Sequence, residues 1–444
     1  MPNAGVFTSQ SKVRPGAYIN FKAERSVNVN GAERGIVAIP LNLGWSEGII
    51  KVSASEIADG AFTNKTACHI TDEAVAPLVE AMKYAESALV YNLVSGGEKA
   101  TATIGTALTV TAKYAGTRGN KLSVAVLATA SEDVYSVVTV LDGVVKNKQE
   151  VQTIEELKDN DLVTFSGTGS LSPVAAVNLT GGTNGNLSAD NYTSFLAAIK
   201  NMRWNTVALP VYDLSNTDAI NAVVPAYIKS MCDAGNKVTA VVYDYPEANC
   251  EHIVSVDQGY KTENGEVNFD AFVGAVAGMM AGTAVNASNT YRLLTGATEI
   301  INPKTDAEIE DGLRKGCFML SQRVDGGIVI ECDINTLVTV DLNQNDSFKK
   351  NRVIRVLDDI AMSIRRIFEN DFIGQVSRND NGKNALKTAI VAYFNNLQNM
   401  EAIQNFTSED VVIENGEGVD SVVVNVSVQP LDSMEKLYMQ VTVA

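Results

Sequence analysis

Residues 95 to 185 carry a single pattern, which constrains the fold more than any other feature of the sequence. Apolar and polar residues alternate over short runs rich in Thr, Val and Gly, without helical periodicity. A period of two is the pattern of a half-buried strand. Such runs occupy 108–114, 122–129, 134–141, 144–151 and 161–166. Five or six strands without a long helix predict a small β-sandwich or barrel of about ninety residues.

Glycine-rich segments in this region have two possible meanings. Asp142-Gly143 separates two of the strands and predicts a two-residue hairpin turn. Gly116-Thr-Arg-Gly-Asn120 and Gly181-Gly-Thr-Asn-Gly185 could cradle a phosphate. Neither has the lysine of a phosphate-binding loop, nor does either open a helix within a strand–helix–strand unit. Because Gly and Asn adopt positive φ at little cost, we interpret both segments as turns.

Strands and helices alternate before and after this region, and this alternation predicts an α/β sheet. The predicted strands are 34–41, 205–211 and 237–243, with a hairpin of 318–324 and 328–333. The predicted helices are 217–234, 269–281, 309–315 and one from Thr71 to before Tyr91, with Val75, Leu78, Val79, Met82 and Leu89 on one face. On the helix at 269–281, Gly274, Gly278 and Ala281 share a side suited to close packing.

The last part of the chain begins near Ile334 with two amphipathic helices. The first has apolar residues at steps of four and three, which are Val353, Leu357, Ile360, Ile364 and Ile367. The second has Leu386, Ile390, Tyr393, Phe394 and Leu397. A short strand at 411–413 and an acidic, glycine-containing turn at 414–418 follow.

Both chain ends carry strand patterns. Near the N-terminus, Ala17, Ile19 and Phe21 alternate with polar neighbours, and Pro15 restricts this strand to a sheet edge. At the C-terminus, 421–429 has four valines on one face, and 436–443 has Leu437, Met439, Val441 and Val443 on one face. Pattern alone slightly favours an intramolecular hairpin of these two C-terminal strands.

Composition excludes several classes of protein. The net charge of −17 argues against general binding of a nucleic-acid backbone. No apolar run is long enough for a transmembrane helix, and the N-terminus lacks a signal-peptide core. The five cysteines are widely spaced, and the only histidines are His69 and His252, so neither a metal site nor a cofactor is expected.

His252 is the one candidate base for a hydrolase in the α/β part. It follows a predicted strand, but no nucleophile elbow of the form Gly-x-Ser-x-Gly accompanies it. A surface or packed histidine is the favoured interpretation, and no catalytic residue is assigned.

Basic residues outnumber acidic ones between 347 and 387, by nine to five. This segment therefore carries +4 in a chain that is acidic overall. A solvated helix face and a docking surface for an acidic partner are equally consistent with it. The candidate contact residues are Lys349, Lys350, Arg352, Arg355, Arg365 and Arg366.

The sequence resembles the contractile tail sheath proteins of myophages and R-type bacteriocins, particularly the family of Gram-positive phages and defective prophages. The order, spacing and total length of several segments carry the resemblance. These are KVRPGAYINF at 12–21, RGIVAIP at 34–40, AGTRGNK at 115–121, LTGGT at 179–183, AGMMAG at 277–282 and PLDSMEKLY at 430–438.

The resemblance implies a multidomain α/β plus β architecture. An inserted β domain at 95–185 would interrupt an α/β domain of subtilisin-like fold at 22–94 and 186–333, without catalytic triad. An α+β domain at 334–435 would face the tail tube through the basic candidates above. Arms at 1–21 and 436–444 would leave their own subunit and complete sheets of neighbours. The implied inter-subunit residues are Val13, Ala17, Ile19, Phe21, Leu437, Met439, Val441 and Val443.

The implied function is structural. Subunits would stack as hexameric rings in a helical polymer around the tail tube, with baseplate and tail terminator proteins as further partners, and contraction would drive the tube through a cell envelope. The resemblance implies assembly in the host cytoplasm and reverses the hairpin interpretation of the C-terminus. Two alternatives remain: an α/β hydrolase using His252, and a surface-binding protein whose β domain holds a ligand.

Overall fold

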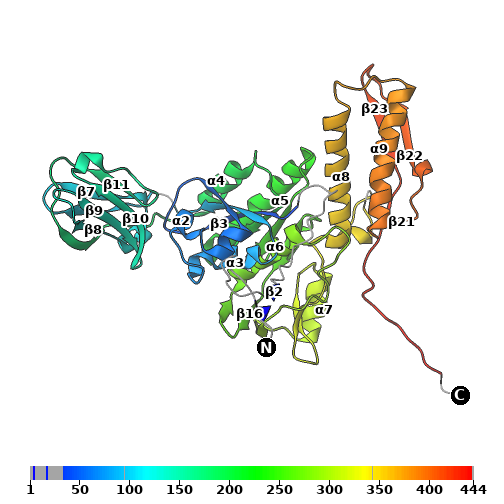
Figure 1. Cartoon of the computed structure of the whole chain (residues 1–444). Helices are drawn as coiled ribbons and strands as arrows, with labels where there is room; N and C mark the ends of the chain where they lie inside the picture. The colour runs from blue at the N-terminus through cyan, green and yellow to red at the C-terminus, as the bar shows by residue number, and fades with distance from the viewer. Residues whose placement is uncertain (1–3, 6–16, 19–33, 95, 343, 443–444) are drawn as a thin grey trace. The chain divides into compact units, whose positions relative to one another are not determined.

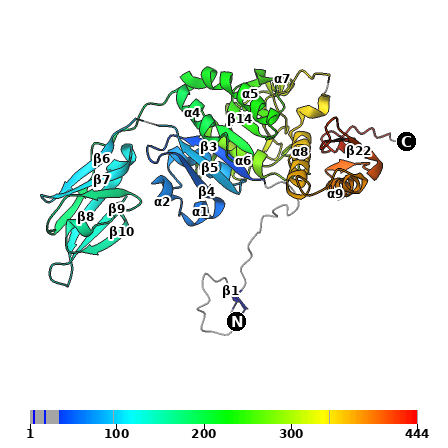
Figure 2. The same cartoon turned by 90° about the horizontal axis from the view of Figure 1, so that it is seen from above.

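The computed structural model describes residues 4–5, 17–18, 34–94, 96–342 and 344–442 (Figures 1 and 2). The chain divides into two compact units, Met1–Glu33 and Arg34–Ala444. In the first unit, strand β1 (Ala4–Gly5) pairs in parallel with β2 (Ala17–Tyr18). The predicted arm residues Val13, Ile19 and Phe21 lie outside the described residues, and only Ala17 falls within β2.

A six-stranded sheet in the order β15-β14-β13-β3-β5-β4 lies at the centre of the second unit. All neighbouring strands are parallel except β4, which runs antiparallel to β5 at the edge. The predicted strands at 34–41, 205–211 and 237–243 are confirmed as β3, β13 and β14. The bounds are β3 (Ile36–Leu41), β4 (Ile49–Ser53), β5 (Ser87–Asn92), β13 (Thr206–Leu209), β14 (Thr239–Tyr243) and β15 (Ile253–Val256).

Helices cover both faces of this sheet, because successive residues of a buried strand point to opposite sides. Val37 and Ile39 of β3 pack with helices α3 and α6, whereas Ala38 packs with α4 and α5. The helix bounds are α3 (Ala76–Met82), α4 (Ala189–Ile199), α5 (Thr217–Asp233) and α6 (Phe269–Gly282).

Helix α6 packs backbone to backbone against α3 through glycines. A Cβ atom on Gly274 would lie 2.1 Å from the carbonyl oxygen of Pro77, and one on Gly278 would lie 2.2 Å from that of Ala81. These two sequence-predicted contacts are confirmed. The third close approach is made by Gly282 rather than Ala281.

The predicted helix beginning at Thr71 is wrong in its second half. Helix α3 ends at Met82, and Leu89 belongs to β5, where it pairs with Ala38 of β3. Short apolar runs do not distinguish a helix from a buried strand, and here the register with β3 decides in favour of a strand.

Seven strands in two sheets fill the stretch between β5 and α4, so the predicted β region is confirmed as layered sheets. The orders are β10-β9-β8-β12 and β11-β7-β6. Asp142 and Gly143 both adopt positive φ in the turn that pairs Leu141 with Val144, as predicted. The five predicted strands are present, and β6 and β12 were missed. The bounds are β6 (Lys99–Ile104), β7 (Leu108–Ala115), β8 (Leu122–Ala128), β9 (Tyr135–Leu141), β10 (Val144–Val151), β11 (Val163–Ser166) and β12 (Val174–Asn178).

Smaller elements surround the central sheet. The predicted hairpin is confirmed as β19 (Leu320–Gln322) and β20 (Ile328–Ile330), and the predicted short helix as α7 (Asp306–Arg314). The sheet β17-β16-β18 and two short helices were not predicted from the sequence. Their bounds are β16 (Gly259–Thr262), β17 (Gly265–Val267), β18 (Ala297–Ile301), α1 (Ala54–Asp59) and α2 (Thr63–Thr66).

The last part of the chain contains helices α8 (Asn351–Asp371) and α9 (Asp380–Asn399), which lie side by side (gold and orange in Figure 1). Their facing apolar side chains form a separate core with the strands that follow, as the predicted periodicity requires. These strands are β21 (Ile403–Gln404), β22 (Val411–Asn415), β23 (Val422–Val426) and β24 (Gln429–Pro430).

Strand β23 pairs with β22 and not with the C-terminal segment. The hairpin that pattern alone favoured for 421–429 and 436–443 is therefore wrong. From 433 to 442 the chain is in neither helix nor strand. In both views the described end of this segment extends away from α8 and α9 (Figures 1 and 2).

Candidate functional site

The C-terminal segment exposes apolar side chains to solvent. Leu437, Tyr438, Met439 and Val441 are 81%, 89%, 75% and 71% exposed. Leu437, Met439 and Val441 occupy alternate positions, so an extended chain presents them on one face. The fourth predicted member, Val443, lies outside the described residues. A run of large exposed apolar residues at regular spacing marks a surface that another protein surface covers.

Two strand edges near this segment lack a partner strand among the described residues. β23 and β24 pair on one side with β22 and β21. Two further backbone bonds join the same two stretches, from Ser427 N to Asp410 O and from Leu431 N to Ala402 O, at 3.1 and 2.9 Å. The stretches 402–415 and 422–431 therefore run side by side through two short ladders, β21–β24 and β22–β23, with a loop and a 3-10 turn at Ser408–Asp410 between β21 and β22. Each outer edge can accept main-chain hydrogen bonds from an added strand.

The six basic candidates do not form one exposed face. Arg355 is only 3% exposed, because its guanidinium is buried against Asp333 Oδ2 (3.3 Å) and the carbonyl oxygen of Ala287 (2.8 Å). Arg355 thus cannot contact a partner from this position, and its assignment as a tube-facing residue is corrected. The reason is that α8 turns this part of its surface toward the central sheet.

The other basic candidates lie nearer the surface, with partners in their own chain. Lys350 pairs with Glu435, and Lys349 pairs with Asp346 at 2.8 Å. Arg352 donates to the carbonyl oxygen of Glu401 at 3.2 Å. Arg365 pairs with Glu369 at 2.7 Å, and Arg366 is half-buried.

Buried polar contacts connect α8 to the central sheet and to α9, and they were not predicted from the sequence. His252 Nε2 lies 2.9 Å from Asp358 Oδ1, and the hydroxyl of Tyr393 donates to Asp359 Oδ2 at 2.7 Å. Charged side chains on an amphipathic helix are normally read as its solvated face. One indication that these side chains are buried was present in the sequence: Arg355, Asp358 and Asp359 lie within one turn of the apolar stripe of α8.

His252 is held as a cation. Burial opposes its protonation, but Asp358 and Glu251 outweigh that effect and raise its pKa well above the ordinary value. The stabilisation from this pair is complete below the free imidazole pKa of about 6.5 and persists through neutral pH. Above the free imidazole pKa it declines steadily, and it is gone once the pH passes the raised pKa of the folded state. A general base must be neutral to accept a proton, so this geometry does not favour the hydrolase alternative.

Cys250, Glu251 and His252 could together hold a metal ion, and they are the one such group among the described residues. However, the Nδ1 and Nε2 atoms of His252 face Glu251 (3.6 Å) and Asp358 (2.9 Å). A carboxylate beside each ring nitrogen, one within hydrogen-bond distance and one within ion-pair distance, suits an imidazolium and not a neutral metal ligand.

The glycine-rich loops at 116–120 and 181–185 bind each other. Asn120 and Gly182 exchange two hydrogen bonds of 2.8 Å, and Thr117 N donates to Asn184 Oδ1 at 2.8 Å. A Cβ atom on Gly116 would lie 1.7 Å from the carbonyl oxygen of Gly44. These backbone groups are thus used within the protein and not left open for a phosphate. Thr117–Lys121 forms a short 3-10 helix, so the first segment is not the simple turn that was predicted.

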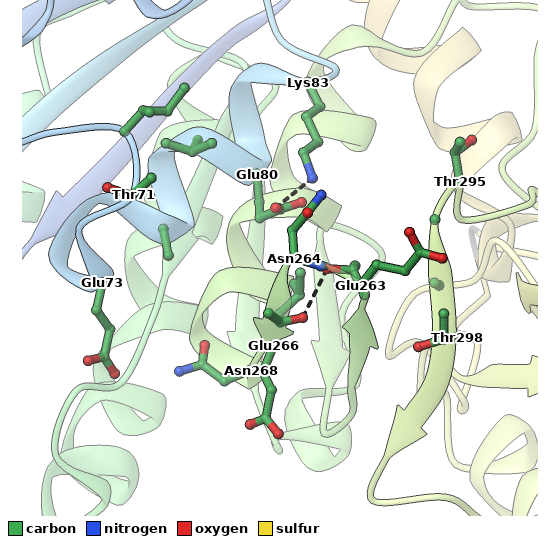
Figure 3. Close-up of a pocket in the computed structure, with 18 of the residues that line it drawn as sticks. Thr71, Glu73, Glu80, Lys83, Glu263, Asn264, Glu266, Asn268, Thr295 and Thr298 are labelled. Atoms are coloured by element: carbon green, nitrogen blue, oxygen red, sulfur yellow. Dashed lines mark hydrogen bonds and ion pairs between the residues drawn. The ribbon is translucent and has the colours of Figure 1, made fainter.

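An open depression of about 860 Å³ lies between α3 and the β16–β17 hairpin (Figure 3). Acidic side chains line it, including Glu73, Glu263 and Glu266. The carboxylate of Glu80 forms an ion pair with Lys83 at 2.6 Å and accepts a hydrogen bond from the Tyr260 hydroxyl at 3.3 Å.

None of the helices among the described residues has the length and apolar character needed to span a membrane.

Three family models match the sequence. The phage tail sheath protein beta-sandwich domain matches residues 95–184, the phage tail sheath protein central domain matches 185–336, and the phage tail sheath C-terminal domain matches 343–444. Among curated proteins, the phage-like element PBSX protein XkdK of Bacillus subtilis (strain 168) is 33% identical, with 99% of this chain and 100% of that protein covered.

Solved structures share the fold. The sheath tail protein from Desulfitobacterium hafniense has a TM-score of 0.82 and 36% sequence identity, with 96% of this chain and 99% of that chain covered. The helical sheath of the anti-feeding prophage in its contracted state has a TM-score of 0.56 and 11% identity, with 96% and 98% covered. This second likeness concerns the fold alone.

Proposed function

Because the chain belongs to the phage tail sheath protein family, we propose that it is a contractile-sheath subunit joined to its neighbours by its terminal arms. The resemblance found in the sequence is thereby confirmed at the level of the family. A sheath protein is a structural component of a tail, and the arm contacts, the ring arrangement and the partners are our proposals.

One observation carries the proposal: the exposed apolar face of the C-terminal segment. Burial of Leu437, Met439 and Val441 contributes about 1.5–3 kcal/mol for each side chain. A neighbour with an open strand edge offers this burial together with main-chain hydrogen bonds. The outer edges of 402–415 and 422–431 are such acceptors, and the same chain therefore has both halves of the contact.

The geometry of such a contact determines the kind of polymer. A segment on one part of the subunit binds an edge on another part, so the contact is heterologous and repeats without closing along the stack. We propose stacked hexameric rings around a tail tube, with the baseplate and a tail terminator at the ends and with assembly in the host cytoplasm. Contraction then releases free energy held at subunit contacts and requires no cofactor.

The domain division expected from the sequence is part of the proposal. The α/β part at 22–94 and 186–333 has a parallel sheet with helices on both faces, which supports a subtilisin-like arrangement. The α+β part at 334–435 has its own core. The surface-binding alternative is less well supported, because the match to a sheath β-sandwich model covers the β region.

Electron microscopy of the purified full-length protein tests the proposal. We expect striated tubular polymers, alone or after addition of a tail tube, because each added subunit repeats the same contact. The control is the same protein in concentrated denaturant, diluted back to native buffer, which should recover the tubes. A single closed oligomer of fixed size under all conditions would contradict the proposal.

We further propose that Lys349, Arg352, Arg365 and Arg366 face the acidic surface of a tail tube. Replacing Lys349 and Arg352 together with Glu should weaken tube-templated assembly, most at low salt where exposed charges are least screened. The measurement is the fraction of tubes decorated with sheath at low and high salt. Equal decoration by the variant and the parent at low salt would show that these charges are only solvated.

A further inference from the structure

The C-terminal segment is anchored at one residue just before it leaves the body of the protein. Glu435 forms an ion pair with Lys350, and its second carboxylate oxygen accepts a hydrogen bond from the Thr290 hydroxyl at 2.8 Å. The Ser433 hydroxyl adds a weaker contact at 3.4 Å. Beyond Glu435, the apolar residues that follow are exposed.

The partners of Glu435 belong to a hydrogen-bonded region around Asp333. Lys350 is the residue immediately before α8, and Thr290 lies in the loop after α6. The Thr290 hydroxyl also accepts from the backbone N–H of Asp333 at 2.9 Å, and Asn351 donates its backbone N–H to the Asp333 carbonyl oxygen at 3.0 Å. The anchor therefore connects the C-terminal segment to the same region that holds Arg355.

The ion pair is partly withdrawn from solvent, which strengthens it relative to a surface pair. The side chain of Glu435 is 13% exposed and that of Lys350 is 24% exposed. Burial opposes ionisation of Glu435, but Lys350 and Thr290 outweigh it and lower the pKa of the carboxyl group. Both groups are therefore charged at neutral pH.

Glu435 lies at the point where the chain could turn back toward its own sheet edge. Strand β24 ends at Pro430, five residues before Glu435, and 436–443 has the alternation of a strand. Loops of four or five residues commonly join two antiparallel strands. Without a restraint at Glu435, the segment could fold back and pair with the open edge of 422–431 in its own chain, where tethering gives a millimolar effective concentration.

We propose that Glu435 and Lys350 form a clamp that directs the C-terminal arm away from its own sheet edge and so leaves both available to a neighbouring subunit. This inference rests on the proposed function. It assigns a role to the PLDSMEKLY segment at 430–438, and it gives Lys350 a partner within its own chain instead of the tail tube.

The test uses hydrogen exchange of full-length subunits at a concentration below that of polymer formation. In the parent protein, the amides of 436–442 should exchange without protection. In Glu435→Gln and Lys350→Met, the arm should pair with its own chain and exchange about tenfold more slowly, the change expected for one charge-assisted hydrogen bond. The concentration needed for polymers should rise by about the same factor.

Two further variants make the result specific. The exchanged pair Lys350→Glu with Glu435→Lys should restore both properties, since the ion pair is reversed but kept. Glu299→Gln removes the acid of an exposed Lys–Glu pair (3.0 Å) and should change neither. Unchanged exchange in Glu435→Gln would overturn the clamp. Slower exchange with an unchanged polymer concentration would show instead that the arm does not join subunits. The exchange experiment needs no polymer, so its outcome is independent of whether the arm joins subunits.

Discussion

A chain lacking 436–444 should fold, stay in solution and form no long polymers. Its described part, residues 436–442, pairs with no strand of the described structure, and Leu437, Met439 and Val441 are exposed. Its removal therefore takes little from the folded subunit. The polymer, in contrast, loses the burial of three or four apolar side chains at each contact, about 1.5–3 kcal/mol for each. The measurement is sedimentation of polymers together with circular dichroism of the subunit.

Substitutions within the same segment separate its two faces. Serine at Leu437, Met439 and Val441 should prevent polymer formation as the deletion does. Serine at Gln440 and Thr442, on the opposite face, should leave it nearly unchanged, because these side chains would point away from the accepting sheet. Normal polymers from the chain without 436–444 would show that the arm does not join subunits.

Arg355→Met should destabilise the folded protein by about 3–5 kcal/mol, the range measured when one partner of a buried ion pair is removed. Asp333 is 1% exposed and would lose the guanidinium that faces it. Met preserves much of the volume, so the effect reports the lost charge more than a cavity. The measurement is the free energy of unfolding from denaturant titration, followed by a probe near α8 because a chain with several domains need not unfold in one step.

Arg365→Met on the same helix is the matched control. Arg365 is 45% exposed and pairs with Glu369 on the surface, where ion pairs contribute about 0–1 kcal/mol. Equal destabilisation by the two substitutions would mean that the buried position of Arg355 has no energetic consequence. The two results together decide which basic residues of α8 are structural and which are free to meet a partner.

Regular periodicity was the most informative part of the sequence. The alternating runs of β7 to β10 and the four- and three-residue steps of α8 predicted elements that the structure confirms. These patterns work because each element buries one face only, and the buried face must recur with the period of the backbone. The glycines of α6 were predictable for a related reason, since an apolar helix with small residues on one side must meet another backbone there.

Predictions from the sequence were wrong where the same residues are compatible with two different local structures or environments. Leu89 extended a helical pattern but lies in β5, because pairing with β3 outweighed local preference. The charges of α8 looked solvated, yet three of them are buried with partners distant in sequence: Arg355 with Asp333, Asp358 with His252, and Asp359 with Tyr393. Spacing along one helix contains no information about a partner that approaches from another part of the chain.

The sequence by itself determined that the C-terminus has a strand pattern with one apolar face, since that depends only on the order of residues 436–443. Only the tertiary structure decided that residues 436–442 pair with no strand among the described residues. β23 pairs with β22, β24 pairs with β21, and Glu435 is held by Lys350 and Thr290. The physical reason is that a strand pattern specifies what is to be buried, whereas the partner is selected by which edges the rest of the fold leaves open.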